Sequence, residues 1–196
     1  MLRTMTQRTL VCEQAISAEG NFQIAALLRF WTEAGAKRWF NKDVEFDAEF
    51  RTRYLDLHLL AASRMLDLWL ETASGALALI LLLDQFPRNA FRNTAHMYAT
   101  DSLALSFAEY AIEHHHDTEV ASDLRLFLYL PFTHSEDIAH QERSLLLHGQ
   151  IGNSKHAVAH HDIIRRFGRF PHRNATLLRI STPSELAFLE TGGFAG

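Results

Sequence analysis

Polar side chains that could bind an anion or carry a proton gather in three short segments of the chain. The first follows an unbroken apolar run, residues 76–83, and reads Asp84-Gln85-Phe86-Pro87-Arg88-Asn89, with Arg92 close behind. The second is His134-Ser135-Glu136-Asp137, and the third, Arg169-Phe170-Pro171-His172-Arg173-Asn174, nearly copies the first. Charged groups at the end of a buried run are costly unless they are paired. We therefore expect the three segments to form one polar pocket.

Arginine side chains offer planar, paired donors that match a carboxylate or a phosphate, so these arginines could form a receptor for a small anion. The four concerned are Arg88, Arg92, Arg169 and Arg173. In the alternative interpretation they pair internally with acids, and those available are Asp84, Asp101, Glu136, Asp137 and Asp162. Buried ion networks of that kind add little net stability but fix geometry. Both interpretations stay open.

Histidines give the same segments a capacity for acid–base chemistry or for binding a divalent metal. His134, His160 and His172 lie in or beside the motifs. His156 and His160 have the spacing of zinc-binding helices, but the glutamate expected after the first histidine is Ala157. A histidine bonded to a carbonyl or a carboxylate is the commoner case, so we predict no metal.

Other chemistries find little support. The sequence contains no Gly-x-Ser-x-Gly elbow, no phosphate loop and no dinucleotide fingerprint, and Ser135 reads as a helix cap. We therefore predict no cofactor and leave open whether the protein is an enzyme. The predicted ligand-binding set comprises Asp84, Arg88, Asn89, Arg92, His134, Glu136, Asp137, Gln141, His160, Arg169, His172, Arg173 and Asn174.

The elements that position these residues are predicted to be helices. Phe is frequent and Val is scarce, which favours helix over strand. The Ala- and Leu-rich run 76–83 is interpreted as a helix buried on all sides, with Pro87 helping to stop it. Helix starts are predicted at Asp43, Thr72 or Ser74, Asp101, Ser122, Ser135, Ser154 and the capping box Thr182-Pro183-Ser184-Glu185, with ends at Gly35 and Gly168.

The predicted architecture is an all-α fold of eight or nine helices in antiparallel pairs, either a compact bundle or a superhelix of hairpins. Residues 1–20 show no firm periodicity and are expected to be an irregular lead-in. Residues 21–190 are expected to form a single domain, and residues 191–196 a tail.

Composition limits the partners. The net charge of -4 argues against a globally basic nucleic-acid binder. A local anion-attracting patch remains between residues 162 and 179, made of Arg165, Arg166, Arg169, Arg173 and Arg179, but without aromatic stacking platforms for RNA. The single cysteine, Cys12, fits a reducing cytoplasm. The longest apolar run is far too short to span a bilayer. We predict a cytoplasmic protein without membrane or nucleic-acid partners. The sequence gives no indication of its oligomeric state.

Four motifs, in order, resemble the marks of a bacterial family catalogued as domain of unknown function 924. They are LDQFPRNAFRNTA, LFLYLPFTHSED with Gln141, HHDIIRRFGRFPHRN and ISTPSELAFL, and the resemblance spans roughly Ala25 to Phe188. It implies helical hairpins like those of the tetratricopeptide superfamily and no settled activity. Two positions depart from the pattern: His161 stands where the family often has Arg, and Leu178 where Gly is expected.

Two functions fit these observations. In the first, the polar pocket binds a small anionic metabolite and could act on it. In the second, the motif residues are structural ion pairs, and a tetratricopeptide-like array presents a concave face to a protein or peptide. The two hypotheses differ in whether Arg88, His134 and Arg173 converge on an open cavity or are sealed in ion pairs.

Overall fold

The computed structural model describes the backbone of residues 2–194 and the side chains of residues 18–194. Within that range every regular element is helical, which confirms the predicted all-α fold. The elements are α1 Leu2–Trp39, α2 Val44–Ala62, η1 Asp67–Glu71, α3 Ala73–Ile80, η2 Leu81–Gln85, α4 Phe86–Ala90, η3 Ala95–Tyr98, α5 Asp101–Glu113, α6 His116–Glu119, α7 Arg125–His134, α8 Ile138–Gln150, α9 Lys155–Phe167, η4 Pro171–Arg173 and α10 Pro183–Glu190. No helix of this described part is long and apolar enough to cross a membrane.

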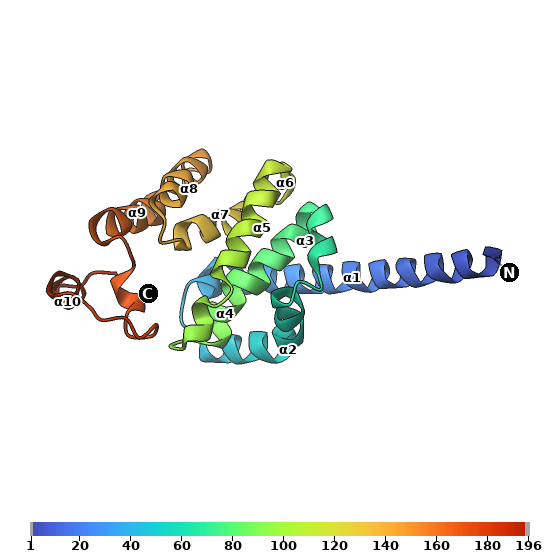
Figure 1. Ribbon diagram of the computed structural model, residues 1–196, viewed down its shortest axis with the longest axis horizontal. Coiled ribbons are helices and arrows are strands. Elements are labelled where there is room, and N and C mark those ends of the chain that lie inside the picture. The colour runs from blue at the N-terminus through green and yellow to red at the C-terminus, as the bar shows by residue number, and fades with distance from the viewer. Residues whose placement is uncertain (1, 195–196) are drawn as a thin grey trace.

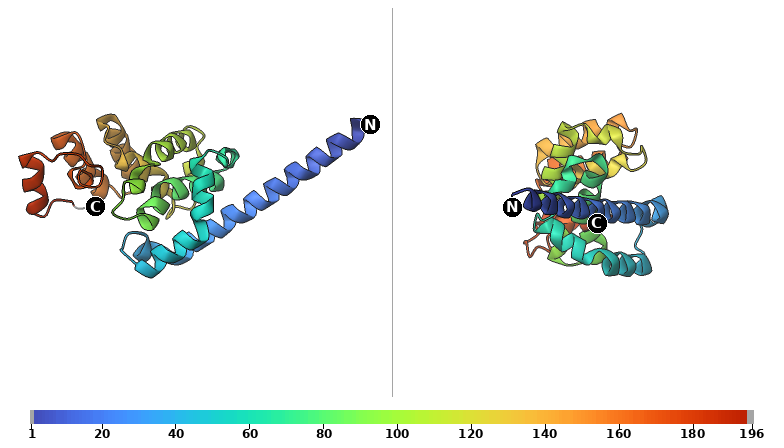
Figure 2. Two further views of the ribbon diagram at one scale, coloured as in Figure 1. Left: turned by 60° about the horizontal axis from the view of Figure 1, so that its bottom comes forward. Right: turned by 90° about the vertical axis from the view of Figure 1, so that its right-hand side faces the viewer.

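The molecule is elongated, with α1 at one end and the last helices at the other (Figure 1). The N-terminal half of α1 extends beyond the other helices, and α8, α9 and α10 lie at the opposite end (Figure 2). Helix α3 lies in the middle and packs against α1, α5 and α7. The main core therefore forms around α3, while a smaller one, built on Ile163, Ile164 and Phe170, holds the C-terminal helices.

Helix α1 differs from the sequence-based prediction. The segment expected to be an irregular lead-in is helical from Leu2 onward. Residues 2–19 contain no Gly or Pro and many good helix formers, so the helix propagates outward from the turns that are anchored in the core. Gly35 was predicted to end this helix, and its backbone does leave the helical region (φ 69°), but the helical trace resumes as far as Trp39. Gly35 thus marks a kink.

Helix α2 is placed as its sequence predicts. The Asp43 carboxylate accepts a hydrogen bond from the Phe46 amide and caps the helix. Phe46, Phe50 and Tyr54 then lie buried on one face, where Phe50 packs against Trp31 of α1 with ring centroids 5.4 Å apart. This aromatic layer fixes α2 against α1 and leaves the polar side of α2 facing the first motif.

The apolar run 76–83 is helical and buried on all sides, as predicted, but Pro87 does not stop it. The helix widens into the π-helical turn η2, in which the Phe86 amide donates to the Leu81 carbonyl, and continues as α4. This turn and the missing N–H of Pro87 leave two carbonyls without helical donors. Side chains replace those donors: His58 Nδ1 donates to Leu82 O at 2.9 Å, and Thr100 Oγ1 donates to Leu83 O at 2.5 Å.

Several helix starts also need correction. The N-cap positions are Thr100 for α5, Leu124 for α7 and Asp137 for α8, in place of Asp101, Ser122 and Ser135. Asp137 caps α8 because its carboxylate accepts from the Ala139 amide at 2.8 Å. Helix α10 keeps the predicted capping box at Thr182, and Gly168 ends α9 in the left-handed conformation, also as predicted.

Candidate functional site

The three polar segments meet where the π-helical turn η2, the first turn of α5, the end of α7 and the short helix η4 come together. We call this meeting place the junction and define it by Asp84, Arg88, Asp101, His134 and Arg173. Its members come from five elements, η2, α4, α5, α7 and η4, of which only η2 and α4 are adjacent in sequence. Each member is connected to another by a hydrogen bond or an ion pair. The junction therefore joins the main core to the C-terminal helices.

Asp84 is the most buried charge of the junction, with its side chain fully enclosed. His134 Nδ1 donates to its Oδ1 at 2.7 Å, Gln85 Nε2 donates to its Oδ2 at 2.6 Å, and Arg88 lies 3.2 Å from Oδ1. Burial raises the pKa of Asp84, but Arg88, His134 and the two hydrogen bonds outweigh it and bring the pKa to about 2. Asp84 is thus a carboxylate at neutral pH.

Asp101 lies between two arginines at the start of α5. Arg88 binds it through two parallel hydrogen bonds, 2.9 Å to Oδ1 and 3.1 Å to Oδ2, and Arg173 Nη1 donates to Oδ2 at 3.1 Å. Arg173 also donates to the carbonyl of His134, and its guanidinium lies between the rings of Tyr98 and Phe170, 4.5 and 4.6 Å from their centroids. These contacts fix the Arg173 side chain in one orientation.

The charges of the junction balance, because two arginines face two aspartates. His134 adds no charge at neutral pH, since burial and the neighbouring Arg88 lower its pKa below the ordinary value, against the opposing effect of Asp84. A carboxylate can only accept hydrogen bonds, so the His134 proton resides on Nδ1. Nε2 then carries a lone pair, and no described residue forms a hydrogen bond with it.

A second ion pair lies beside the junction. Arg179 binds Glu136 through two hydrogen bonds, Nη1 to Oε2 at 2.6 Å and Nη2 to Oε1 at 2.9 Å, and the Phe170 amide donates to the same carboxylate. Arg179 also donates to Asn174 Oδ1. Gln141 is buried and donates to three carbonyls at the end of α7. Glu136, Asn174 and Gln141 therefore position the backbone around His134 and Phe170.

Three further residues of the predicted set pair with acids of α2 and α10, outside the junction. Asn89 and Arg92 both bind Asp47 of α2, at 2.7 Å and 2.6 Å. Arg169 binds Glu185 of α10 through two hydrogen bonds of 2.6 and 2.9 Å. Asp137, also in the predicted set, is the N-cap of α8. The first two contacts connect α4 and the residues after it to α2, and the third connects the segment between α9 and η4 to α10.

His134, His160 and His172 form a histidine cluster, in which the buried ring of Phe170 lies beside His160 and His172. The rings of His134 and His160 lie 6.4 Å apart, and Phe170 lies 5.3 Å from His160 and 5.5 Å from His172. Burial is the main cause that lowers the pKa of His160 to about 4 and that of His172 to about 3. His160 Nδ1 donates to the carbonyl of His156, whereas His172 Nδ1 is buried without a partner. In the described part of the chain, no three His, Cys, Asp or Glu side chains are arranged to hold a metal.

Sequence reasoning left four important partners out of the predicted site. They are Asp47, Tyr98, Asp101 and Arg179. Asp101 and Arg179 carried a signal, as a possible arginine partner and as a member of the basic patch. Asp47 and Tyr98 carried none, because each reaches the site only through the packing of its element.

Two hollows lie beside the junction. One, of about 270 Å³, is lined by α9, α10 and Phe194, and the other, of about 500 Å³, by the start of α8 and the end of α9. Neither is lined by Arg88, His134 or Arg173. These three side chains do converge, but they are largely sealed in ion pairs and hydrogen bonds, with at most 14% of each side chain exposed.

Comparisons with known proteins agree with this architecture. Residues 27–193 match the model of a family described as bacterial protein of unknown function (DUF924). A solved structure of a protein of unknown function from Agrobacterium tumefaciens, ATU0120, is 55% identical in sequence. The match covers 88% of this chain and 99% of the other, with a TM-score of 0.86. No curated protein matches the chain.

Proposed function

The chain belongs to the bacterial DUF924 family, and from that premise we propose that it binds a small anionic metabolite beside the junction and uses His134 to accept or donate a proton. The observation that carries the proposal is the hydrogen bond from His134 Nδ1 to the buried carboxylate of Asp84. An aspartate that fixes the tautomer of a histidine in this way prepares the opposite ring nitrogen to act as a general base.

Asp84 suits that supporting role because its charge is secured. Arg88 lies within ion-pair distance of it, and Gln85 occupies its second oxygen. The imidazolium that would form when Nε2 takes a proton would therefore face a carboxylate 2.7 Å away. Such a pre-oriented charge pair needs no rearrangement during proton transfer, which is the main way in which a protein lowers the barrier of such a step.

Hydrogen-bonding groups that the ion pairs leave unused could hold the ligand. Arg173 Nε and His172 Nδ1 are both buried without a partner, and Arg173 Nε carries a proton that only an acceptor can satisfy. Tyr98, a half-buried residue whose ring lies against the Arg173 guanidinium, adds a hydroxyl group. Because unsatisfied buried donors are costly, an anion with oxygen acceptors is the ligand class that they favour.

The remaining predicted arginines have a structural role in this proposal. Arg92 and Arg169 each face a carboxylate from another helix, and Arg88 serves two aspartates at once. Their cost of burial is offset by pairing, so they preserve the geometry of the junction without contacting the ligand. We place the activity in the cytoplasm, because a single cysteine fits a reducing compartment.

Thermal unfolding with a panel of small carboxylates and phosphates tests the proposal. We expect at least one anion to raise the Tm of the wild type and to lose that effect in Arg173→Lys and His134→Gln. Arg169→Lys is the matched control, because it weakens an ion pair outside the junction and should keep the ligand response. If no anion stabilises the wild type, or if Arg169→Lys abolishes the response as fully as Arg173→Lys, the proposal is wrong.

A tetratricopeptide-like scaffold is the second candidate. Two observations favour it: the motif residues are occupied by ion pairs, and Ile138, Leu146 and Val158 expose apolar side chains on α8 and α9. A scaffold of this kind would bind its partner through those side chains. Leu146→Glu should then abolish a reproducible pull-down partner, while leaving every anion-induced change of Tm intact.

A further inference from the structure

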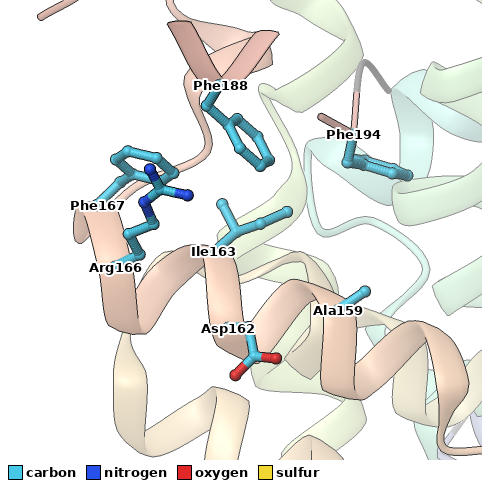
Figure 3. A pocket seen from close by; sticks show the side chains of 7 residues that line it. All are labelled: Ala159, Asp162, Ile163, Arg166, Phe167, Phe188 and Phe194. Carbon is cyan, nitrogen blue, oxygen red and sulfur yellow. The ribbon is translucent and has the colours of Figure 1, made fainter. Parts of the chain in front are cut away.

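A hollow of about 270 Å³ separates α9 from α10 and carries an almost wholly apolar lining. Its walls are Ala159, Ile163 and Phe167 of α9, Phe188 of α10 and Phe194 of the C-terminal segment, with Asp162 and Arg166 at the rim. Figure 3 shows the Ile163 side chain turned toward the ring of Phe188, with the Phe194 ring facing them from the other side. An apolar cavity of about 150 Å³ holds a benzene ring, so this hollow has room for one ring with a short substituent.

Arg166 gives the hollow its charge. Of the five arginines between residues 162 and 179, four face a carboxylate. The pairs are Arg165–Asp162, Arg169–Glu185, Arg173–Asp101 and Arg179–Glu136. Arg166 is the remaining one, since no carboxylate of residues 18–194 lies within ion-pair distance of it. The basic patch expected from the sequence thus reduces to a single unpaired cation at the rim of this hollow.

Two aromatic rings hold the Arg166 guanidinium in place. Its central carbon lies 4.7 Å from the centroid of Phe167 and 5.8 Å from that of Phe188. Stacking engages the faces of the guanidinium and leaves the N–H groups along its edge available to a carboxylate. Asp162, the acid at the same rim, points away from the rings in Figure 3 and faces Arg165 at 3.3 Å. The positive charge of Arg166 therefore lies next to the aromatic rings that line the hollow.

We propose that this hollow is a second binding site, which takes a small monocarboxylate with one apolar ring. The ring lies among Ile163, Phe188 and Phe194, and the carboxylate binds the edge of the Arg166 guanidinium. The proposal does not rest on the function proposed for the junction, because neither Arg166 nor Phe188 belongs to the junction. Phe194 borders both the hollow and the histidine cluster: its ring lies 4.7 Å from His160 and 5.0 Å from His172.

The test measures the binding of 4-fluorophenylacetate to the full-length protein by fluorine NMR. The neutral 4-fluorobenzyl alcohol is the uncharged comparison ligand. A ligand of this size is expected to bind with a dissociation constant on the order of millimolar. The acid should bind about three- to fivefold tighter than the alcohol, as an exposed ion pair allows. That preference should vanish in Arg166→Gln and persist in the control Arg165→Gln.

Phe194→Ala provides an independent variant, because this ring is 38% exposed and its removal leaves the cores intact. It should weaken both ligands about equally, since each loses the same apolar wall. Equal affinity of acid and alcohol in the wild type, an equal effect of Arg165→Gln and Arg166→Gln, or unchanged affinity in Phe194→Ala would each overturn the proposal. Absence of binding at about 20 mM ligand, well above the expected constant, would overturn it as well.

Discussion

His134 and Asp84 are fifty positions apart in sequence and share a hydrogen bond of 2.7 Å between Nδ1 and Oδ1. This contact joins the end of α7 to the π-helical turn inside the most buried part of the chain. It orients one imidazole, fixes its tautomer and stabilises a charge that is otherwise costly to bury. The same contact therefore both stabilises the packing of α7 against the π-helical turn and, in the proposed function, prepares His134 for acid–base chemistry.

Acidification should reveal the contribution of Asp84 to stability. Its pKa is lowered from 3.8 to about 2 in the folded protein, so the stabilisation is complete above about pH 4 and is lost as the pH falls towards 2. The shift corresponds to about 2 kcal/mol at neutral pH. Urea denaturation of the wild type and Asp84→Asn between pH 3 and pH 7 should show a difference in unfolding free energy that shrinks with acid.

The exposed carboxylate of Asp123 provides the control for this series, and Asp123→Asn should follow the wild type at every pH. The buried histidines affect the pH dependence of stability at higher pH than Asp84 does. Because the pKa of His160 and of His172 lies near 4 and 3 in the folded state, the unfolded chain binds protons first as the pH drops below 6.5. Stability should therefore decline from about pH 6.5 downward in Asp84→Asn as well. A difference between wild type and Asp84→Asn that stays constant with pH would contradict the assignment.

Replacing Leu178 with glycine should stabilise the folded protein. It stands where the family resemblance predicts glycine, and it adopts a left-handed backbone (φ 55°) with 93% of its surface exposed. A leucine in that region is strained, whereas glycine adopts it freely, so Leu178→Gly should raise the unfolding free energy by about 0.5–1 kcal/mol. The comparison is Leu186→Gly, another exposed leucine but within α10, which should lose about 1 kcal/mol. A loss of stability in both variants would show that the left-handed backbone at Leu178 is not strained.

Thr100 should contribute to stability because its hydroxyl replaces the amide hydrogen that Pro87 lacks. The Thr100 hydroxyl donates to the Leu83 carbonyl, which lies fully buried in the core. Thr100→Val should cost about 1–3 kcal/mol, because it leaves that carbonyl unpaired. Adding Pro87→Ala restores a backbone donor in the same turn, so the double variant should recover part of the loss. Strictly additive effects of the two substitutions in urea denaturation would show that the two positions do not share this carbonyl.

The sequence predicts helices well where apolar residues follow a helical period or form an Ala- and Leu-rich run. The stripe of Phe46, Phe50 and Tyr54 and the run 76–83 lie where they were expected, because apolar patterning dominates local structure there. Helix ends were predicted less well. The run 76–83 passes through Pro87 because side chains from α2 and η3–α5 satisfy its freed carbonyls, and no local pattern contains that information.

The meeting of the three segments was predicted, but the pairing of their charges was not. The three segments meet, since each places charge at the end of an apolar helix that must bury it. The pairing of acids with arginines depends on tertiary packing. Asp47 binds Arg92, 45 positions away in sequence, and Asp101 binds Arg173, 72 positions away. Asp101 was expected to cap a helix, yet Thr100 occupies that position and frees the carboxylate for two arginines.

The most direct test of the central claim is nitrogen NMR of the protein labelled with ¹⁵N-histidine, with inorganic phosphate and malonate as titrants. At pH 7 the account predicts that His134 carries its proton on Nδ1 and that its Nε2 is unprotonated. It also predicts that the Nε2 resonance shifts saturably with at least one of the two anions, and that Arg173→Lys weakens this response. A proton on Nε2, or an Nε2 resonance that neither anion moves, would contradict the account.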